Sequence, residues 1–271
     1  TPIGDVTTTM LWIGGQITTL AVMQGVFLAS MVNLLVPLSA AGWMTRGRLV
    51  VPPKVVASNK ADTSALEQAV MLALGLSVLV MVPVFKAVTH LPPFMGVLLG
   101  LGVLWLVGDL MHKDKGEEEK HGLTLVSALG RIDMSAIVFF IGILLAVAVL
   151  EHSHILPALA AWLDHAVGRQ DVIVLIIGLV SAVVDNVPLV AASMGMYDLA
   201  QYPADSFLWE FMAYCAGTGG SILIIGSAAG VATMGLERID FIWYLRKISG
   251  LALAGYLAGA LVYVLQFHAT H

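Results

Sequence analysis

The sequence predicts an all-α membrane protein that crosses the bilayer several times and has helices broken at membrane depth. Of its residues, 59% are hydrophobic and only 11% are charged, whereas soluble domains carry about 25% charged residues. Several apolar runs approach the length of about 20 residues that a helix needs to cross a bilayer. Acids, amides, glycines and prolines interrupt some of these runs, which indicates helices that break inside the membrane.

The net charge and the cysteine count argue against several other classes of protein. The formal net charge is -5, which argues against a nucleic-acid partner. The single cysteine, Cys215, excludes an intrachain disulfide and a metal site built from cysteines. Ser-His-Asp, Walker and Rossmann patterns are absent, so we expect neither an enzyme nor a bound cofactor. The chain begins at Thr1 rather than Met, and we expect it to be the carboxyl-terminal part of a longer protein.

The apolar runs divide the chain into the end of one repeat, a loop and a second repeat. Residues 1–43 hold a short half-helix and a first span, and residues 44–68 form a basic loop. Residues 69–268 form the second repeat. Its expected elements, in chain order, are spans over 69–88, 94–111 and 134–150, an interfacial helix over 155–167, a hairpin over 171–197, a broken helix over 209–235 and a last span over 239–267.

Residues 155–167 are too short to cross a bilayer and suit a helix that lies at its surface. The amphipathic Trp162 and the polar Asp164 are typical of such an interfacial helix. Histidines gather at the same level and titrate near neutral pH, but their spacing gives little support for a metal site. We interpret them as interfacial side chains; they are His152, His154 and His165.

Residues 171–197 contain the strongest polar interruption of an apolar run. Asp185, Asn186 and Pro188 stand at its centre. A carboxylate at bilayer depth costs at least about 2.5–3.5 kcal/mol on insertion scales, and Pro188 prevents a regular helix from continuing through it. One alternative is a kinked helix with a structurally paired acid. We favour a broken helix in which Asp185 and Asn186 line an ion site, because ionisable residues inside a membrane are usually functional.

Lysines and arginines favour a hairpin over a single span for residues 171–197. If the basic loop after the first span is cytoplasmic, the lysine-rich loop at 112–131 is cytoplasmic too. A hairpin that enters and leaves from outside then places the basic-free loop at 198–208 outside. It also places the carboxyl terminus outside. The basic residues that this topology brings to the cytoplasmic side are Arg238, Arg246 and Lys247.

Two further breaks supply oxygen atoms suited to a hard cation. Glycines at 217, 219 and 220 unwind a helix and turn its carbonyl groups toward a ligand, and Thr218 and Ser221 add hydroxyls. Close helix packing is the alternative for these glycines. Asp5 is a second intramembrane carboxylate, followed by Thr7 and Thr8. A carboxylate that can hold either a proton or a sodium ion permits exchange between the two.

These residues form the predicted ion- and proton-binding set. Its members are Asp5, Thr7, Thr8, Asp185, Asn186, Thr218, Gly219 and Ser221. Within it, the candidates for direct contact with Na⁺ are Asp5, Asp185, Asn186 and Thr218. The break near Asp5 and the break at 217–221 are each followed by a half-helix and a span, in opposite orientations under the topology above. Inverted repeats with broken helices that meet at the midplane are typical of secondary transporters.

The motifs resemble those of NhaD-type sodium/proton antiporters, which belong to the ion-transporter superfamily together with citrate, divalent-anion and arsenite transporters. The segments that carry the resemblance are Pro2-Ile-Gly-Asp-Val-Thr-Thr-Thr, Ser181-Ala-Val-Val-Asp-Asn-Val-Pro and Ala216-Gly-Thr-Gly-Gly-Ser-Ile. The resemblance implies a homodimer in the inner (plasma) membrane that exports Na⁺ or Li⁺ in exchange for H⁺ by an elevator-like motion. It also implies that Asp185 and Asn186 form the tip of a re-entrant hairpin.

Three other interpretations stay open from the sequence. A carboxylate or anion symporter would share this scaffold, but dicarboxylate carriers of the superfamily carry Ser-Asn-Thr at the hairpin tip. The acid at Asp185 would repel an anionic substrate. A membrane hydrolase would need Asp5 and Asp185 within reach of one water molecule. A membrane scaffold would use the polar breaks only for structure.

Overall fold

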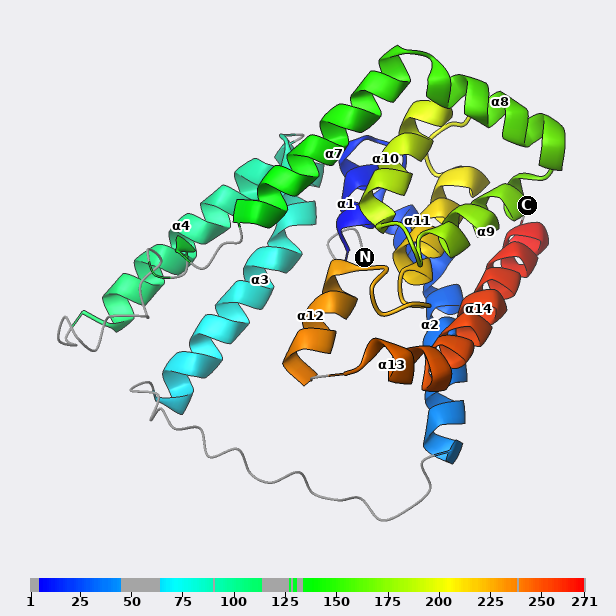
Figure 1. Ribbon diagram of the computed structural model, residues 1–271. Coiled ribbons are helices and arrows are strands. Elements are labelled where there is room, and N and C mark those ends of the chain that lie inside the picture. The colour runs from blue at the N-terminus through cyan, green and yellow to red at the C-terminus, as the bar shows by residue number, and fades with distance from the viewer. Residues whose placement is uncertain are drawn as a thin grey trace. The chain divides into compact units, whose positions relative to one another are not determined.

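The computed structural model describes residues 5–44, 64–89, 91–113, 127, 129–130, 134–237 and 239–270. These residues form helices joined by turns, and no strand occurs among them (Figure 1). Gly4, most of the expected basic loop over 44–68, and most of the charged loop over 112–131 lie outside the described residues. Contacts divide the chain into two compact units, Thr1–Gly47 with Phe139–His271, and Arg48–Val138.

The unit Arg48–Val138 contains two long apolar helices, α3 (Ala65–Thr89) and α4 (Pro93–Met111). They pack through glycines of α4. A methyl group added at Gly96 would lie 2.9 Å from the ring of Phe85, so the absent side chain lets the helices approach closely. Val82 is the one buried residue of α3, and all of its other residues are exposed or half-buried. Both helices are long and apolar enough to cross a membrane.

The other unit holds the remaining helices, except for the first residues of α7, which belong to the unit Arg48–Val138. In chain order they are α1 (Val6–Ile13), α2 (Thr19–Met44), α7 (Met134–His152), α8 (Ile155–Val167), α9 (Gln170–Val180), α10 (Asn186–Met196), α11 (Phe207–Gly219), α12 (Ala228–Glu237), α13 (Phe241–Lys247) and α14 (Ser249–Thr270). Among the described residues, four helices of the chain could each span a membrane, or five if the bent pair α7–α8 is one span.

Helix α11 forms the centre of this unit. It packs against α2, α9 and α14, and each of its residues from Leu208 to Ala216 is buried. A helix that is apolar and buried on all sides belongs to a core. Around it, α14 lies against α2 through small residues. A methyl group at Gly255 would lie 2.6 Å from the carbonyl oxygen of Asn33, and one at Gly259 would lie 2.6 Å from that of Ala29.

Helices α9 and α10 leave α8 and return to it. Helix α9 follows α8 through Gly168, whose φ of 68° is the left-handed conformation that glycine readily adopts. Residues 181–185 separate α9 from α10, and the end of α10 comes back to the start of α8. A methyl group added there, at Gly195, would lie 3.0 Å from Leu156 and 3.2 Å from Glu151. Both ends of the segment 171–197 therefore lie on the side of the unit that α8 covers (Figure 1).

Two other expected elements are divided into separate helices. The helix expected to break within 209–235 consists of α11 and α12, with residues 220–227 between them. The range 239–267, expected as one last span, contains the short α13 and the long α14. Asp240 begins α13 by accepting a hydrogen bond from the Trp243 amide at 3.0 Å. The helix long enough to span a membrane therefore begins at Ser249.

Candidate functional site

Three broken helix ends meet inside the larger unit. Helix α1 packs against α10 and α11, and α10 also packs against α11. At the start of α10, the Asn186 side-chain amide donates to the carbonyl oxygen of Ala216 at 3.5 Å. At the start of α1, a methyl group added at Gly217 would lie 3.5 Å from the Asp5 carboxylate and 3.8 Å from the Thr7 hydroxyl. We call this meeting of the α1 and α10 starts with the α11 end the junction.

An aspartate immediately precedes each helix that starts at the junction, as its N-cap residue. The Asp185 carboxylate accepts from the Val187 amide at 3.4 Å. The Asp5 carboxylate accepts from the Thr7 hydroxyl, and its backbone carbonyl accepts from the Thr9 amide at 3.0 Å. Helix starts carry partial positive charge, which stabilises these carboxylates. The α11 end contributes carbonyl groups with partial negative charge, so oxygen atoms face the junction from three helices.

Beside the junction, α1, α2 and α11 enclose a cavity of about 410 Å³. Its lining includes the Asp5 carboxylate and the hydroxyl groups of Thr8, Thr218 and Ser30. The Thr218 hydroxyl donates to the Tyr214 carbonyl at 2.7 Å, so its oxygen stays available to accept or to coordinate. Carboxylate, hydroxyl and carbonyl oxygens are the ligands that hard cations prefer. In the part of the chain that is described, no cluster of three or more His, Cys, Asp or Glu could hold a metal ion.

The structure thus brings most of the predicted set together, in two neighbouring groups. Asp5 and Thr8 face the cavity with Thr218, and the buried Thr7 bonds to Asp5. Asp185 is half-buried, and Asn186 is buried beside the α11 end. Ser30 is an addition that the sequence did not single out, because serines in apolar helices commonly bond back to their own backbone.

Two members of the predicted set have other surroundings. Gly219 packs directly on the end of α9, where a methyl group would lie 2.6 Å from the Ser181 hydroxyl and would overlap the carbonyl of Gly178. This contact corresponds to the packing alternative for the glycines. The side chain of Ser221 is exposed, and its carbonyl accepts from the Tyr244 hydroxyl at 2.8 Å. Ser221 therefore lies near the start of the break, and no described contact places its side chain at the junction.

Sequence reasoning overlooked a third buried carboxylate, Glu210 in the first turn of α11. Its side chain accepts from the Tyr263 hydroxyl of α14 at 3.0 Å, and it is 8% exposed. Gly25 of α2 lies against it, because a methyl group there would be 2.9 Å from the carboxyl carbon. The signal was present in the sequence, since Glu210 stands between Trp209 and Phe211. It was missed because it lies near the start of the apolar segment, where an acid is ordinarily solvated.

The long apolar helices and the junction between broken helix ends define a multi-pass membrane protein with polar groups held inside its helix bundle. Comparison with known families identifies the family to which the chain belongs. The chain belongs to the citrate transporter family, whose sequence pattern matches residues 1–217. No solved structure matches the chain significantly.

Several relatives are named sodium/proton antiporters. The chain is 53% identical to sodium/proton antiporter 1 of Arabidopsis thaliana over 273 residues, which cover 100% of this chain and 46% of that protein. It is 47% identical to sodium/proton antiporter 2 of the same plant, covering 97% of this chain and 63% of that protein. It is 29% identical to the Na⁺/H⁺ antiporter NhaD of Alkalimonas amylolytica, covering 97% of this chain and 57% of that protein.

These relatives confirm the resemblance to NhaD-type antiporters that the motifs indicated. The likeness extends over almost the whole chain in each case. In turn, the chain spans about half the length of the relatives that it matches.

Proposed function

We propose that the protein is a secondary active transporter that exchanges Na⁺ or Li⁺ for H⁺ across a membrane by alternating access. The observation that carries this proposal is the convergence of two helix starts on one broken helix end: Asp5 lies against Gly217, and Asn186, next to Asp185, bonds to Ala216. The names of the plant and bacterial relatives support it.

The chemistry of the junction suits competition between a cation and a proton. A carboxylate shielded from water can be neutralised either by protonation or by a nearby cation. The hydroxyls of Thr8 and Thr218 and the α11 carbonyls supply further oxygen ligands that do not take up protons. Asn186 likewise offers a neutral amide. Binding of the cation would therefore release a proton from an aspartate, and binding of a proton would release the cation.

Packing indicates which elements would move together. Helices α9 and α11 meet at Gly178 and Gly219, and at both positions an added methyl group would overlap backbone of the other helix or come within 2.7 Å of it. The Tyr256 hydroxyl of α14 also donates to the Leu175 carbonyl of α9 at 2.8 Å. We propose that α9–α10 is a re-entrant hairpin that moves with α11. The same proposal includes inverted repeats, an elevator-like motion, a homodimer in the inner membrane and an external carboxyl terminus.

A carboxylate symporter is the second candidate, and the description of the family as citrate transporters is consistent with it. The charge of the junction argues for a cation instead. Asp5 and Asp185 stand at the helix starts, and none of the described residues placed at the junction is a lysine or an arginine. The relatives carry the names of transporters, so we propose no enzymatic reaction and no cofactor besides the transported ions.

The proposal is tested with the full-length protein in everted vesicles that contain a pH-sensitive dye. Addition of Na⁺ or Li⁺ should dissipate a preformed proton gradient, and Asp185→Asn should abolish this response. Asp240→Asn is the matched control, because Asp240 also begins a helix but is exposed. Normal exchange by Asp185→Asn would contradict the assignment. Accumulation of labelled citrate without Na⁺-driven proton movement would favour the symporter.

A further inference from the structure

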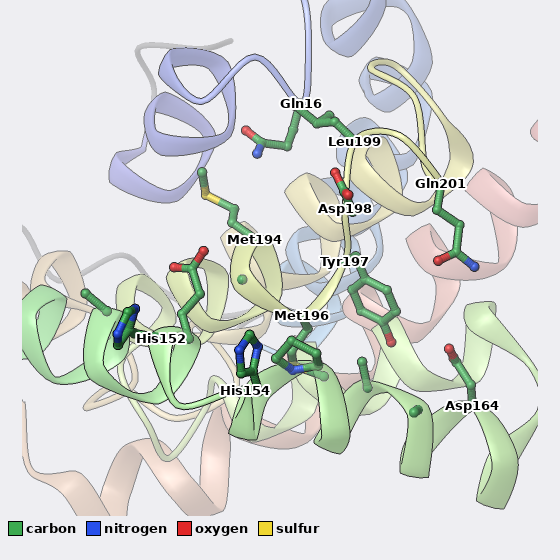
Figure 2. Close-up of a pocket in the computed structure, with 16 residues that line it drawn as sticks. Gln16, His152, His154, Asp164, Met194, Met196, Tyr197, Asp198, Leu199 and Gln201 are labelled. Carbon is green, nitrogen blue, oxygen red and sulfur yellow. The ribbon is translucent and has the colours of Figure 1, made fainter.

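A second and larger cavity lies on the side of α8. Its volume is about 990 Å³, and it is lined by the end of α7, by α8, by the turn after α10 and by Gln16 (Figure 2). Three carboxylates face it, those of Glu151, Asp164 and Asp198. None of the described residues in its lining is a lysine or an arginine. The other titratable side chains in the lining are His152, His154 and Tyr197.

A buried hydroxyl without a partner points to a ligand in this cavity. Tyr197 is 4% exposed, and within the described part of the chain its hydroxyl has no hydrogen-bond partner. Figure 2 shows this hydroxyl directed into the cavity toward Asp164. Buried polar groups are almost always satisfied by protein or by water. An unpartnered hydroxyl aimed at this space favours water or a hydrated solute over an apolar ligand between α8 and the turn after α10.

The large cavity continues toward the junction. A smaller cavity of about 360 Å³ runs between α1, α7 and α10, and it shares Gln16 and Glu151 with the large one. Its lining reaches Met10 on α1 and Ala191 on α10. Each of these residues is five positions from the aspartate or asparagine that starts its helix, or roughly 8 Å along the axis at about 1.5 Å per residue. The two cavities thus lead from the α8 side to within about two turns of Asp5 and Asn186.

Gln16 lies where the two cavities meet. It is 6% exposed, and its amide nitrogen, in the orientation that satisfies its hydrogen bonds, donates to the carbonyls of Leu11 and Gly14 at 3.0 and 3.2 Å. The amide oxygen is then the atom left to accept. Together with the Glu151 carboxylate it places two oxygen acceptors at the neck of the passage.

We propose that the large cavity is a vestibule that attracts hydrated monovalent cations and connects the α8 side with the junction along the α1–α10 interface, with Glu151 and Gln16 at its neck. The proposal rests on the proposed cation exchange and adds a second, outer site to it. Three carboxylates without a basic residue in the lining focus a negative potential on the cavity. They are not clustered tightly enough to hold a bare metal ion, as far as the described residues show, so the cation keeps its water.

The first test measures access and charge selectivity at the neck. Ala148→Cys is made in the full-length protein without other reactive cysteines, because Ala148 lines both cavities. Labelling is compared between a trimethylammonium and a sulfonate methanethiosulfonate reagent, each normalised to its rate with a free thiol. We expect the cationic reagent to react at least tenfold faster. The ratio should fall below about twofold when Ala148→Cys is combined with E151Q, D164N and D198N.

Ala146→Cys is the matched control, since Ala146 lies on the same helix but lines neither cavity. Its labelling should show no comparable preference for the cationic reagent. Equal rates of the two reagents at Ala148→Cys would overturn the proposal, and so would an absence of labelling by both. Labelling does not need transport, so such a failure leaves the exchange proposal intact. Conversely, normal exchange by Asp185→Asn would contradict the exchange proposal without changing the labelling.

The second test distinguishes attraction of Na⁺ to the cavity from the exchange step itself. In proteoliposomes at about 0.01 M ionic strength, where the Debye length is about 30 Å, E151Q/D164N/D198N should raise the half-saturating Na⁺ concentration by about three- to tenfold. The maximal rate should stay unchanged. Choline chloride at about 1 M, where the Debye length is about 3 Å, should remove the difference. A lowered maximal rate with unchanged half-saturation would overturn the vestibule.

Discussion

The junction and the vestibule both contain carboxylates, but their surroundings differ. At the junction, Asp5 and Asp185 begin helices and contact hydroxyl or amide groups of the same chain. In the vestibule, Glu151 and Asp198 lie on exposed surfaces around a cavity more than twice as large as the one beside the junction. Under our proposals, the carboxylates of the junction bind the cation directly, whereas the carboxylates of the vestibule only attract a cation that keeps its water.

The largest expected effect comes from overpacking the contact between α11 and α9 that supports the junction. Gly219→Ala would place a methyl group onto the Gly178 carbonyl and within 2.6 Å of the Ser181 hydroxyl. Overpacking of this kind destabilises a protein by about 1–3 kcal/mol. Here it would also separate α11 from α9. We expect loss of exchange and a lower thermal midpoint for the detergent-solubilised protein. Gly102→Ala is the control, because a methyl group there meets nothing within 4 Å; equal behaviour of the two variants would refute the packing role.

The second-largest expected effect tests whether the start of α1, like that of α10, binds the transported cation. Asp5→Asn keeps the hydrogen bond from the Thr7 hydroxyl but removes the charge from the cavity beside the junction. We expect at least a tenfold loss of exchange rate at saturating Na⁺, with a thermal midpoint close to that of the unchanged protein. A rise in half-saturation that vanishes at high ionic strength would instead give Asp5 the role assigned to the vestibule acids.

The smallest expected effect concerns the buried acid away from both sites. Glu210→Gln keeps an acceptor for the Tyr263 hydroxyl, so we expect near-normal exchange and stability. Glu210→Ala leaves that hydroxyl buried without this acceptor, which costs about 1–3 kcal/mol and should lower the thermal midpoint. If Glu210→Gln abolished exchange while the protein stayed folded, Glu210 would be a third member of the transport machinery rather than a contact between helices.

Much of the helix pattern could be predicted from the sequence. Long apolar runs give helices that suit a bilayer, and the spans expected over 69–88 and 94–111 correspond to α3 and α4. Pro188 and the glycines after Gly217 marked positions where helices start or end, because these residues alter backbone hydrogen bonding or freedom wherever they occur. The division of the last segment into α13 and α14 was not foreseen, since both parts are apolar.

By itself, the sequence determined that this is a helical membrane protein and that Asp5, Asp185 and Asn186 are unusual, because a polar group in an apolar run is costly in any fold. Only the tertiary structure decided that Asp5 and Asn186 meet the end of α11, that Gly219 is a packing contact, and that Glu210 pairs with Tyr263. It also decided that carboxylates from α7, α8 and the turn after α10 surround one cavity. These relations join residues far apart in the chain, and only three-dimensional packing fixes the distances between them.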